Sequence, residues 1–412
     1  TCRDFGQNYL NSMDAKGNPV IFTNGDNDTF PLWYNQETEG VRTDARVCNL
    51  SYLQTDWYID QMRRPAYDSP SLPISWTRLQ YVTGTREGIP VQPDALQQVI
   101  DYYKDSPEDL KQMLGDNPYE LKNIIRHWVL NDNPDLQIFP TDSIVVTVDK
   151  EAVKRSGMMI AADSIPDVMH ISLKGKRAVY KSEMMMLEMI SQANWERPLY
   201  MSTTVGPDNY GHLGDNFVQE GLACRITPFD TKQSGRTIDS ERMYNNMMNK
   251  FKYGGLKENP DIYLDETVIR MCYTHRRLFN QLAQQLLKEG QKDKALKVLQ
   301  RAEEEIPGSI VPHEAFYGHS LELADAWLAL GHKAEAEKLL NAVGQNAKEY
   351  IEWYLSLNTQ RLLQSSRECL MQIYILNDIA KTWEPIDKKK AETYRMEVNN
   401  YASRCHQRGM SL

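Results

Sequence analysis

The sequence predicts an α/β domain, with a mixed or mostly parallel sheet and flanking helices, followed by an all-α domain of tetratricopeptide-like helical repeats. The first is expected over residues 1–255, because short β-branched and aromatic runs alternate there with helical patterns. The second is expected over residues 256–412, where the strand patterns stop and small residues recur at an offset of 41. These small residues are Ala283, Gly290 and Ala295, then Ala324, Gly331 and Ala336.

Each repeated set of small residues predicts one helical hairpin. It has a small residue where two helices touch, a glycine at the turn and an alanine that opens the next helix. The offset exceeds the roughly 34 residues of a standard tetratricopeptide repeat, and the excess fits a link over residues 306–319. Residues 351–404 supply further helices that would cap the array. Such arrays bind partners or brace other parts and carry no chemistry of their own.

The composition is that of an ordinary globular protein, with 41% hydrophobic and 25% charged residues over 412 positions. The net charge of −9 argues against nucleic acid or an anionic membrane as a partner. The longest apolar runs fall short of the roughly 20 residues of a membrane span. We expect no signal peptide, so either the protein is cytosolic or targeting parts were removed. Six cysteines without a CxxC pair predict plain thiols and neither a zinc site nor a disulfide framework.

The segment from Pro19 to Tyr34, PVIFTNGDNDTFPLWY, has the pattern of a buried strand that turns into a helix. The strand is expected over residues 20–23 and the helix from Phe30 to Gly40, with Pro31 in its first turn. A second strand is expected over residues 45–53. Strand, helix and strand form a βαβ unit, which predicts parallel strands.

Polar side chains gather where the first strand meets its helix, and ligands usually bind at that corner of an α/β sheet. The candidates are Asn24, Asp26, Asn27, Asp28 and Thr29, with the adjacent Trp33 and Tyr34. Asp56 and Trp57 end the second strand and are expected beside this acidic turn. Turn and N-cap duty is one interpretation. A calcium loop is disfavoured because its glycine comes too early, so no metal is predicted. The other interpretation is a site that hydrogen-bonds a sugar or an extended peptide.

The second half of the domain repeats this outline, with an apolar strand over residues 198–203 and a polar loop after it. If both strands share a sheet, both loops lie at its carboxyl edge and form a candidate cleft. Thr203, Thr204, His212 and Asp215 are the candidates from this loop, although His212 and Asp215 also fit a surface pair. The chain lacks HExxH, GxSxG and GxxxxGK[ST] motifs, so the sequence gives no support for a hydrolase or nucleotide-binding site of these kinds. A free-standing α/β enzyme with its site in this loop stays open as an alternative.

Three segments resemble a family of multi-spanning bacterial membrane proteins, common in Bacteroidota and long described as a domain of unknown function. They are FTNGDNDTFPLWYNQETEGVRTDARVCNLSYLQTDWYIDQM (residues 22–62), ANWERPLYMSTT (residues 193–204) and EGLACRITP (residues 220–228). The animal relative of that family is a transmembrane protein O-mannosyltransferase. The resemblance runs over residues 1–230 and continues into the helical repeats.

The resemblance implies a protein O-glycosyltransferase that uses a lipid-linked sugar donor, of which this chain is the soluble C-terminal part on the periplasmic or extracytoplasmic side. It implies no cofactor in this chain, and its own membrane domain and an acceptor polypeptide as partners. No catalytic residue carries over, because the membrane half would hold the lipid-sugar site and the catalytic acid. The layout of residues 24–34 is similar to the acceptor-reading segment of oligosaccharyltransferases. We therefore expect acceptor binding at the acidic turn, with a protein-interaction scaffold built on the helical repeats as the alternative.

Overall fold

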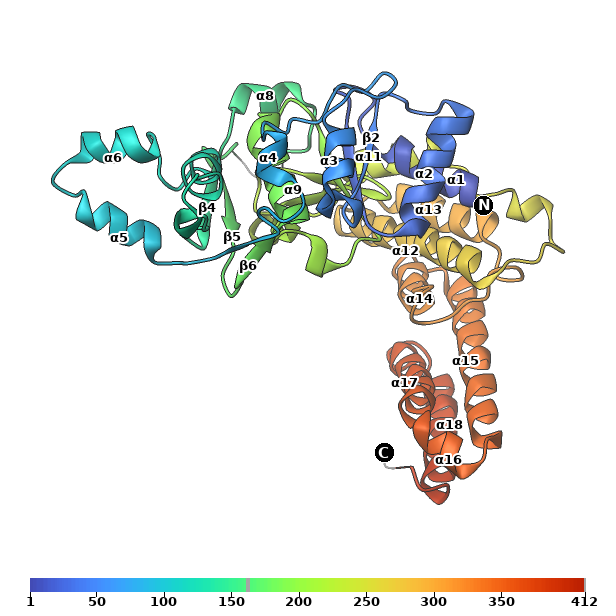
Figure 1. Ribbon diagram of the computed structural model, residues 1–412. Coiled ribbons are helices and arrows are strands. Elements are labelled where there is room, and N and C mark those ends of the chain that lie inside the picture. The colour runs from blue at the N-terminus through green and yellow to red at the C-terminus, as the bar shows by residue number, and fades with distance from the viewer. Residues whose placement is uncertain (161–163, 411–412) are drawn as a thin grey trace. The chain divides into compact units, whose positions relative to one another are not determined.

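A computed structural model describes residues 1–160 and 164–410. The chain divides into two compact units, one of residues 3–252 and one of residues 253–412 with residues 1–2. All strands in the described ranges belong to the first unit, and the second unit is helical (Figure 1). This arrangement confirms the predicted fold class, an α/β domain followed by an all-α domain.

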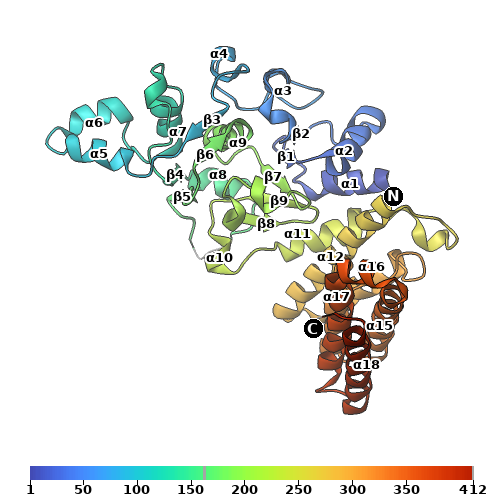
Figure 2. The ribbon, with the colours of Figure 1, turned by 60° about the horizontal axis from the view of Figure 1, so that its bottom comes forward.

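The main sheet of the first unit has five strands in the order β2-β1-β7-β9-β8 (Figure 2). Strand β1 pairs in parallel with both β2 and β7, whereas β9 runs antiparallel to β7 and β8. The sheet is therefore mixed, with its parallel part around β1. The strand bounds are β1 Val20–Thr23, β2 Arg46–Asn49, β7 Leu199–Ser202, β8 Phe217–Gln219 and β9 Ala223–Ile226.

Two antiparallel strand pairs accompany the main sheet, one of β3 Gly88–Pro90 with β6 Ala178–Tyr180, and one of β4 Ser143–Thr147 with β5 Val168–Ser172. The α-helices of this unit are α1 Cys2–Ser12, α2 Asp26–Glu39, α3 Asp56–Met62, α4 Arg78–Tyr81, α5 Ala95–Tyr102, α6 Pro107–Leu114, α7 Leu121–Ile124, α8 Lys150–Arg155, α9 Lys181–Ala193, α10 Thr231–Ser234 and α11 Ser240–Asn245. Helix α9 is buried over most of its length and shares one hydrophobic core with β1 and β7.

Helix α2 begins at Asp26 and not at Phe30, so the prediction for its start is wrong. Pro31 consequently lies inside the helix and not in its first turn. The earlier start is favoured because Asp26 and Asp28 place negative charge at the positive end of the helix dipole. Gly25, with φ of 88°, supplies the left-handed residue that lets the chain leave β1 directly into the helix.

Strand β2 ends at Asn49, four residues before the predicted end at Leu53. The Asn49 side chain accepts the N–H of Tyr52 at 3.1 Å, which turns the backbone into a short 3₁₀ helix over Tyr52–Gln54. This local hydrogen bond competes with the strand ladder, as asparagine side chains often do.

The helical unit consists of α12 Glu266–Lys288, α13 Lys292–Glu305, α14 Ser320–Ala329, α15 Lys333–Ser356, α16 Thr359–Gln364, α17 Ser366–Trp383 and α18 Lys388–Gln407. Helices α12 and α13 form one hairpin, and α14 and α15 form the next. Gly290 and Gly331 lie at the two turns with φ of 76° and 82°, and the four recurring alanines are fully buried. The 41-residue pattern therefore reports two helical hairpins, in which small residues let the helices approach closely.

Candidate functional site

The carboxyl ends of β1, β2 and β7 meet at one edge of the main sheet. The chain leaves β1 through α2 to β2 on one side, while β7 is the neighbour of β1 on the other side. A point where the strand order diverges in this way opens a crevice in α/β sheets, and ligands bind there.

Hydrogen bonds join the two loops at this edge. The Oδ2 atom of Asp28 accepts from Thr204 Oγ1 at 2.9 Å, from Ser202 Oγ at 3.2 Å and from the backbone N–H of Asn24 at 3.2 Å. Asn24 Oδ1 also accepts from Ser51 Oγ at 2.6 Å, which ties in the end of β2. We call these five residues the carboxyl-edge corner.

Within the carboxyl-edge corner, Asp28 is only 3% exposed, and burial raises the pKa of its carboxyl above the usual range. Its second oxygen, Oδ1, is buried and has no hydrogen-bond partner among the described residues. Tyr9 lies against the same group, since its hydroxyl is 3.0 Å from Thr204 Oγ1. Burial and the nearby Asp28 carboxylate raise the pKa of Tyr9 to about 12. Asp28 therefore orders the corner from inside. Thr204 is exposed, as are Asp26 and Asn27 next to the corner.

Two replacements of Asp28 distinguish the effect of its charge from the effect of its hydrogen bonds. We expect Asp28→Ala to cost about 2 kcal/mol of unfolding free energy, because buried donors lose their acceptor. Asp28→Asn keeps an acceptor and should stay within about 1 kcal/mol of wild type at neutral pH. Because folding raises the pKa of Asp28, its proton stabilises the fold at low pH, and this contribution is lost as the pH rises through the raised pKa. Urea unfolding at pH 4 and pH 7 measures the stability of Asp28→Asn relative to wild type. The unfolding free energy of the variant, relative to that of wild type, should be higher at pH 7 than at pH 4. An equal difference at both pH values would contradict the raised pKa.

The remaining candidates, Thr29, Thr203 and Tyr34, have different surroundings. Thr29 is fully buried, and its Oγ1 lies 2.7 Å from Thr23 Oγ1 and accepts from Asn49 Nδ2 at 2.9 Å. Thr203 is half-buried, and its Oγ1 has no partner in the described part of the chain. Tyr34 is exposed and donates to Glu39 at 3.2 Å.

Trp33 and Trp57 line a second feature, which we call the aromatic groove. This groove has a volume of about 490 Å³ and lies between α2, β2 and α3. Its lining consists of Trp33, Gln36, Glu37, Ala45, Arg46, Val47, Tyr52, Trp57, Tyr58, Gln61, Met62, Ala66 and Tyr67. Tyr52, Tyr58 and Tyr67 were not predicted as site residues. The aromatic spacing in LSYLQTDWY was a visible signal for Tyr52 and Tyr58.

The side chain of Asp56 points away from the groove that its neighbour Trp57 lines. Its carboxylate accepts the N–H of Thr83 at 3.4 Å and lies 3.7 Å from Arg78. These contacts tie Asp56 to the segment around α4, and no hydrogen bond or ion pair in the described chain links it to the acidic turn. The two residues were expected together beside the turn, but the start of α3 at Asp56 directs their side chains apart.

His212 and Asp215 line another cavity, with a volume of about 810 Å³, together with residues of β5 and α10. Asp215 Oδ2 is 4.0 Å from the Lys232 ammonium, and both side chains are mostly exposed. The lining of this cavity includes no residue of the carboxyl-edge corner or of the aromatic groove. Residues of the loop that follows β7 therefore belong to two separate places, Thr204 to the corner and His212 to this cavity.

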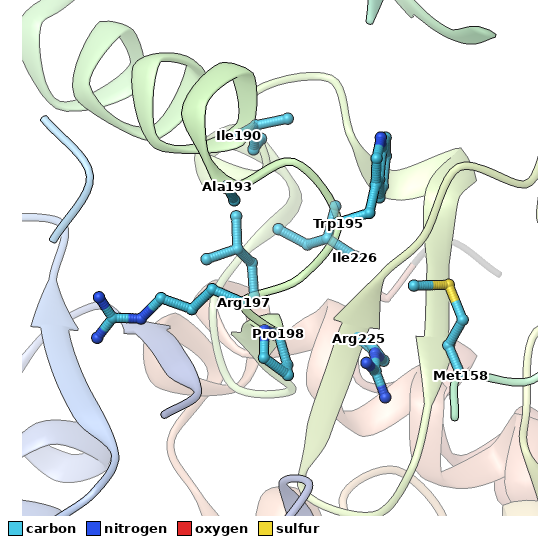
Figure 3. A pocket seen from close by; sticks show the side chains of 9 residues that line it. Met158, Ile190, Ala193, Trp195, Arg197, Pro198, Arg225 and Ile226 are labelled. Carbon is cyan, nitrogen blue, oxygen red and sulfur yellow. The ribbon is translucent and has the colours of Figure 1, made fainter. Parts of the chain in front are cut away.

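A small cavity lies at the opposite, amino-terminal end of β7 (Figure 3). It has a volume of about 20 Å³, enough for roughly one water molecule. Figure 3 shows apolar side chains such as Ile190 and Met158 around it, with Arg197 and Arg225 at its sides. A cavity of this size is too small for a substrate.

Among the described residues, no group of three or more histidine, cysteine, aspartate or glutamate side chains has the geometry to hold a metal ion. None of the helices in the same ranges is both long enough and apolar enough to cross a membrane.

Comparison with known proteins gives a match at the level of a family. A family model described as TMEM260-associated domain 2 matches residues 2–246, which include every strand of the main sheet and both candidate features. No curated protein and no solved structure matches the chain.

Proposed function

We propose a function from the finding that the chain belongs to the family of the TMEM260-associated domain 2. In this proposal the chain is the extracytoplasmic, acceptor-binding part of a membrane-bound protein O-glycosyltransferase. TMEM260 is an animal protein O-mannosyltransferase, which supports a role in protein glycosylation. In this proposal a membrane domain holds the lipid-linked sugar donor and supplies the catalytic groups. The present chain then contributes binding and orientation of the acceptor polypeptide.

The observation that carries this proposal is the carboxyl-edge corner. Asp28 holds the loops after β1 and β7 together from inside, so that the exposed Asp26, Asn27 and Thr204 come from adjoining segments. An acceptor polypeptide offers backbone N–H groups and serine or threonine hydroxyls, and these donate to carboxylate and amide oxygens. A preorganised acceptor surface of this kind lowers the entropic cost of presenting one hydroxyl to a distant catalytic group.

The test uses the full-length parent protein and a model acceptor polypeptide. We expect Asp26→Ala combined with Asn27→Ala to reduce sugar transfer at least about tenfold, chiefly by raising the KM for the acceptor, since both changes remove exposed acceptor groups. Asp208→Asn is the control, because Asp208 is an exposed aspartate of the loop after β7, outside the corner. Equal melting temperatures would show that the variants are folded. Unchanged transfer by the double variant would overturn the proposal.

A non-catalytic scaffold is the second candidate function, and the helical unit supports it. Trp353 and Tyr374 are 54% and 58% exposed, on α15 and α17, two helices that pack against each other. Exposed aromatic side chains of this kind anchor protein partners. If deletion of residues 256–412 abolishes capture of a partner while sugar transfer stays intact, the scaffold describes the helical unit. Loss of transfer without loss of a partner would favour bracing of the enzyme.

A further inference from the structure

We propose that the aromatic groove is a saccharide-binding site, a role separate from the acceptor surface of the carboxyl-edge corner. The groove combines broad aromatic faces with a few polar groups of both hydrogen-bonding types. A pyranose ring has the matching chemistry, because its C–H faces are apolar and its hydroxyls both donate and accept. The volume of about 490 Å³ lies within the range of small-ligand pockets.

Aromatic rings from α2, the 3₁₀ helix after β2 and α3 lie next to one another in the groove. The rings of Trp33 and Tyr52 are 6.2 Å apart and nearly parallel, at 17°, and the ring of Trp57 lies 5.9 Å from that of Tyr52. Trp57 and Tyr67 line the groove and are 54% and 60% exposed, so much of their aromatic surface is open to solvent. Exposed aromatic faces beside a pocket are costly in water and gain most from an apolar ligand face.

The edge of β2 in the groove is closed to an added peptide strand. The carbonyl of Ala45 accepts from Gln36 Nε2 at 2.9 Å, and the N–H of Asn49 donates to the Tyr58 hydroxyl at 2.9 Å. The same hydroxyl donates to the carbonyl of Val47 at 3.4 Å. Strand addition draws its affinity from free main-chain groups at a sheet edge. Because side chains already occupy these groups, an extended peptide gains little here.

The polar groups of the groove include both a donor and acceptors without partners. Arg46 is 5% exposed, and its Nε–H has no hydrogen-bond partner among the described residues. The Glu37 carboxylate is held by the hydroxyl of Tyr67, which leaves its other oxygen as an acceptor. Gln36 uses its NH₂ group on two backbone carbonyls, which leaves its side-chain oxygen as an acceptor. The Arg46 Nε–H is itself buried, so the acceptors of Glu37 and Gln36 are the polar groups of the groove that a ligand would meet.

These groups distinguish a saccharide from a proline-rich peptide, the other ligand that aromatic grooves commonly bind. A proline-rich segment presents carbonyl acceptors but few N–H donors. It would leave the acceptors of Glu37 and Gln36 unmatched. Sugar hydroxyls match both acceptors, because each hydroxyl donates one hydrogen bond and accepts others.

The test measures binding of free sugars by the 412-residue chain, without sugar transfer. The probes are methyl glycosides of glucose, mannose, galactose and N-acetylglucosamine, observed by saturation-transfer difference NMR and titration. We expect at least one probe to bind, and Trp57→Ala to weaken it about tenfold or more. Tyr34→Ala is the matched control, since Tyr34 is an exposed aromatic residue of α2 outside the groove. Tyr34→Ala should leave binding unchanged.

Further probes separate the two sources of such a sugar. A serine peptide that carries the bound sugar is compared with the bare peptide and with the corresponding glycosyl phosphate. Tighter binding of the glycopeptide indicates a glycan already on the acceptor, and tighter binding of the glycosyl phosphate indicates the donor. Either result supports the saccharide site. Absence of binding by all glycosides, or binding of a proline-rich peptide that depends on Trp57, overturns it. The outcome is independent of the transfer assay, so the two proposals fail separately.

Discussion

Arg225→Met is expected to cost about 3–5 kcal/mol of unfolding free energy at neutral pH, because it breaks a buried ion network. The Arg225 side chain is 1% exposed and lies 3.4 Å from Asp14 and 3.8 Å from Glu220, which is fully buried. Arg242 lies 3.4 Å from the same Glu220, and the Tyr200 hydroxyl donates to it at 2.9 Å. Loss of Arg225 leaves the buried carboxylate with one cation in place of two. Urea unfolding measures the difference.

The cost of Arg225→Met should depend on pH, because Glu220 changes its charge in the same range. Burial raises the pKa of Glu220 from 4.5 to about 7, and Arg225 opposes that rise. The stabilising proton on Glu220 is fully present below about pH 4.5 and is lost as the pH rises to about 7. The cost of Arg225→Met should therefore be smaller at pH 5 than at pH 8. Lys232→Met is the control, since its exposed pair with Asp215 should change stability by less than about 0.5 kcal/mol. An equal cost of Arg225→Met at both pH values would contradict the network.

Gly6→Ala should destabilise the first unit by about 3 kcal/mol, because the added methyl group has no room. A Cβ atom at Gly6 would lie 2.3 Å from the carbonyl oxygen of Pro31 and 2.6 Å from Asn35 Nδ2. Both contacts are with α2, and one is with its backbone, so α1 and α2 would have to move apart. Thermal unfolding reports the loss as a lower melting temperature.

Gly206→Ala is the matched control for Gly6→Ala. No atom lies within 4 Å of a Cβ at Gly206, and its φ of −76° suits any residue. We expect its unfolding free energy to stay within about 0.5 kcal/mol of wild type. Similar melting temperatures for the two variants would show that α1 and α2 are less closely packed than their contact indicates.

The fold could be predicted largely from local patterns. The run of β-branched and aromatic residues over β1 and the glycine-bounded helix α2 are signals carried by neighbouring residues, as are the recurring alanines of the helical hairpins. The polar loops after β1 and β7 were also expected at one edge, because parallel strands end together. Residues close in sequence determine such elements, so no long-range information was needed.

The character of individual site residues was not predictable in this way. Asp26 and Asp28 are equivalent in the sequence, yet Asp26 is exposed and Asp28 is buried against Ser202 and Thr204, about 175 residues further along the chain. The start of α2 at Asp26 decides which carboxylate faces the sheet, since successive helical residues point 100° apart. The pKa of Asp28 follows from that burial.

The sequence by itself determined the order of the elements, the division into an α/β part and a helical part, and a polar edge around residues 24–29. Only the tertiary structure decided that Asp28 is internal, that Asp56 turns away, and that Trp33, Tyr52 and Trp57 line one groove. Periodicity reports the faces of single helices and strands. A groove depends on how elements pack, and that packing depends on contacts between residues far apart in the chain.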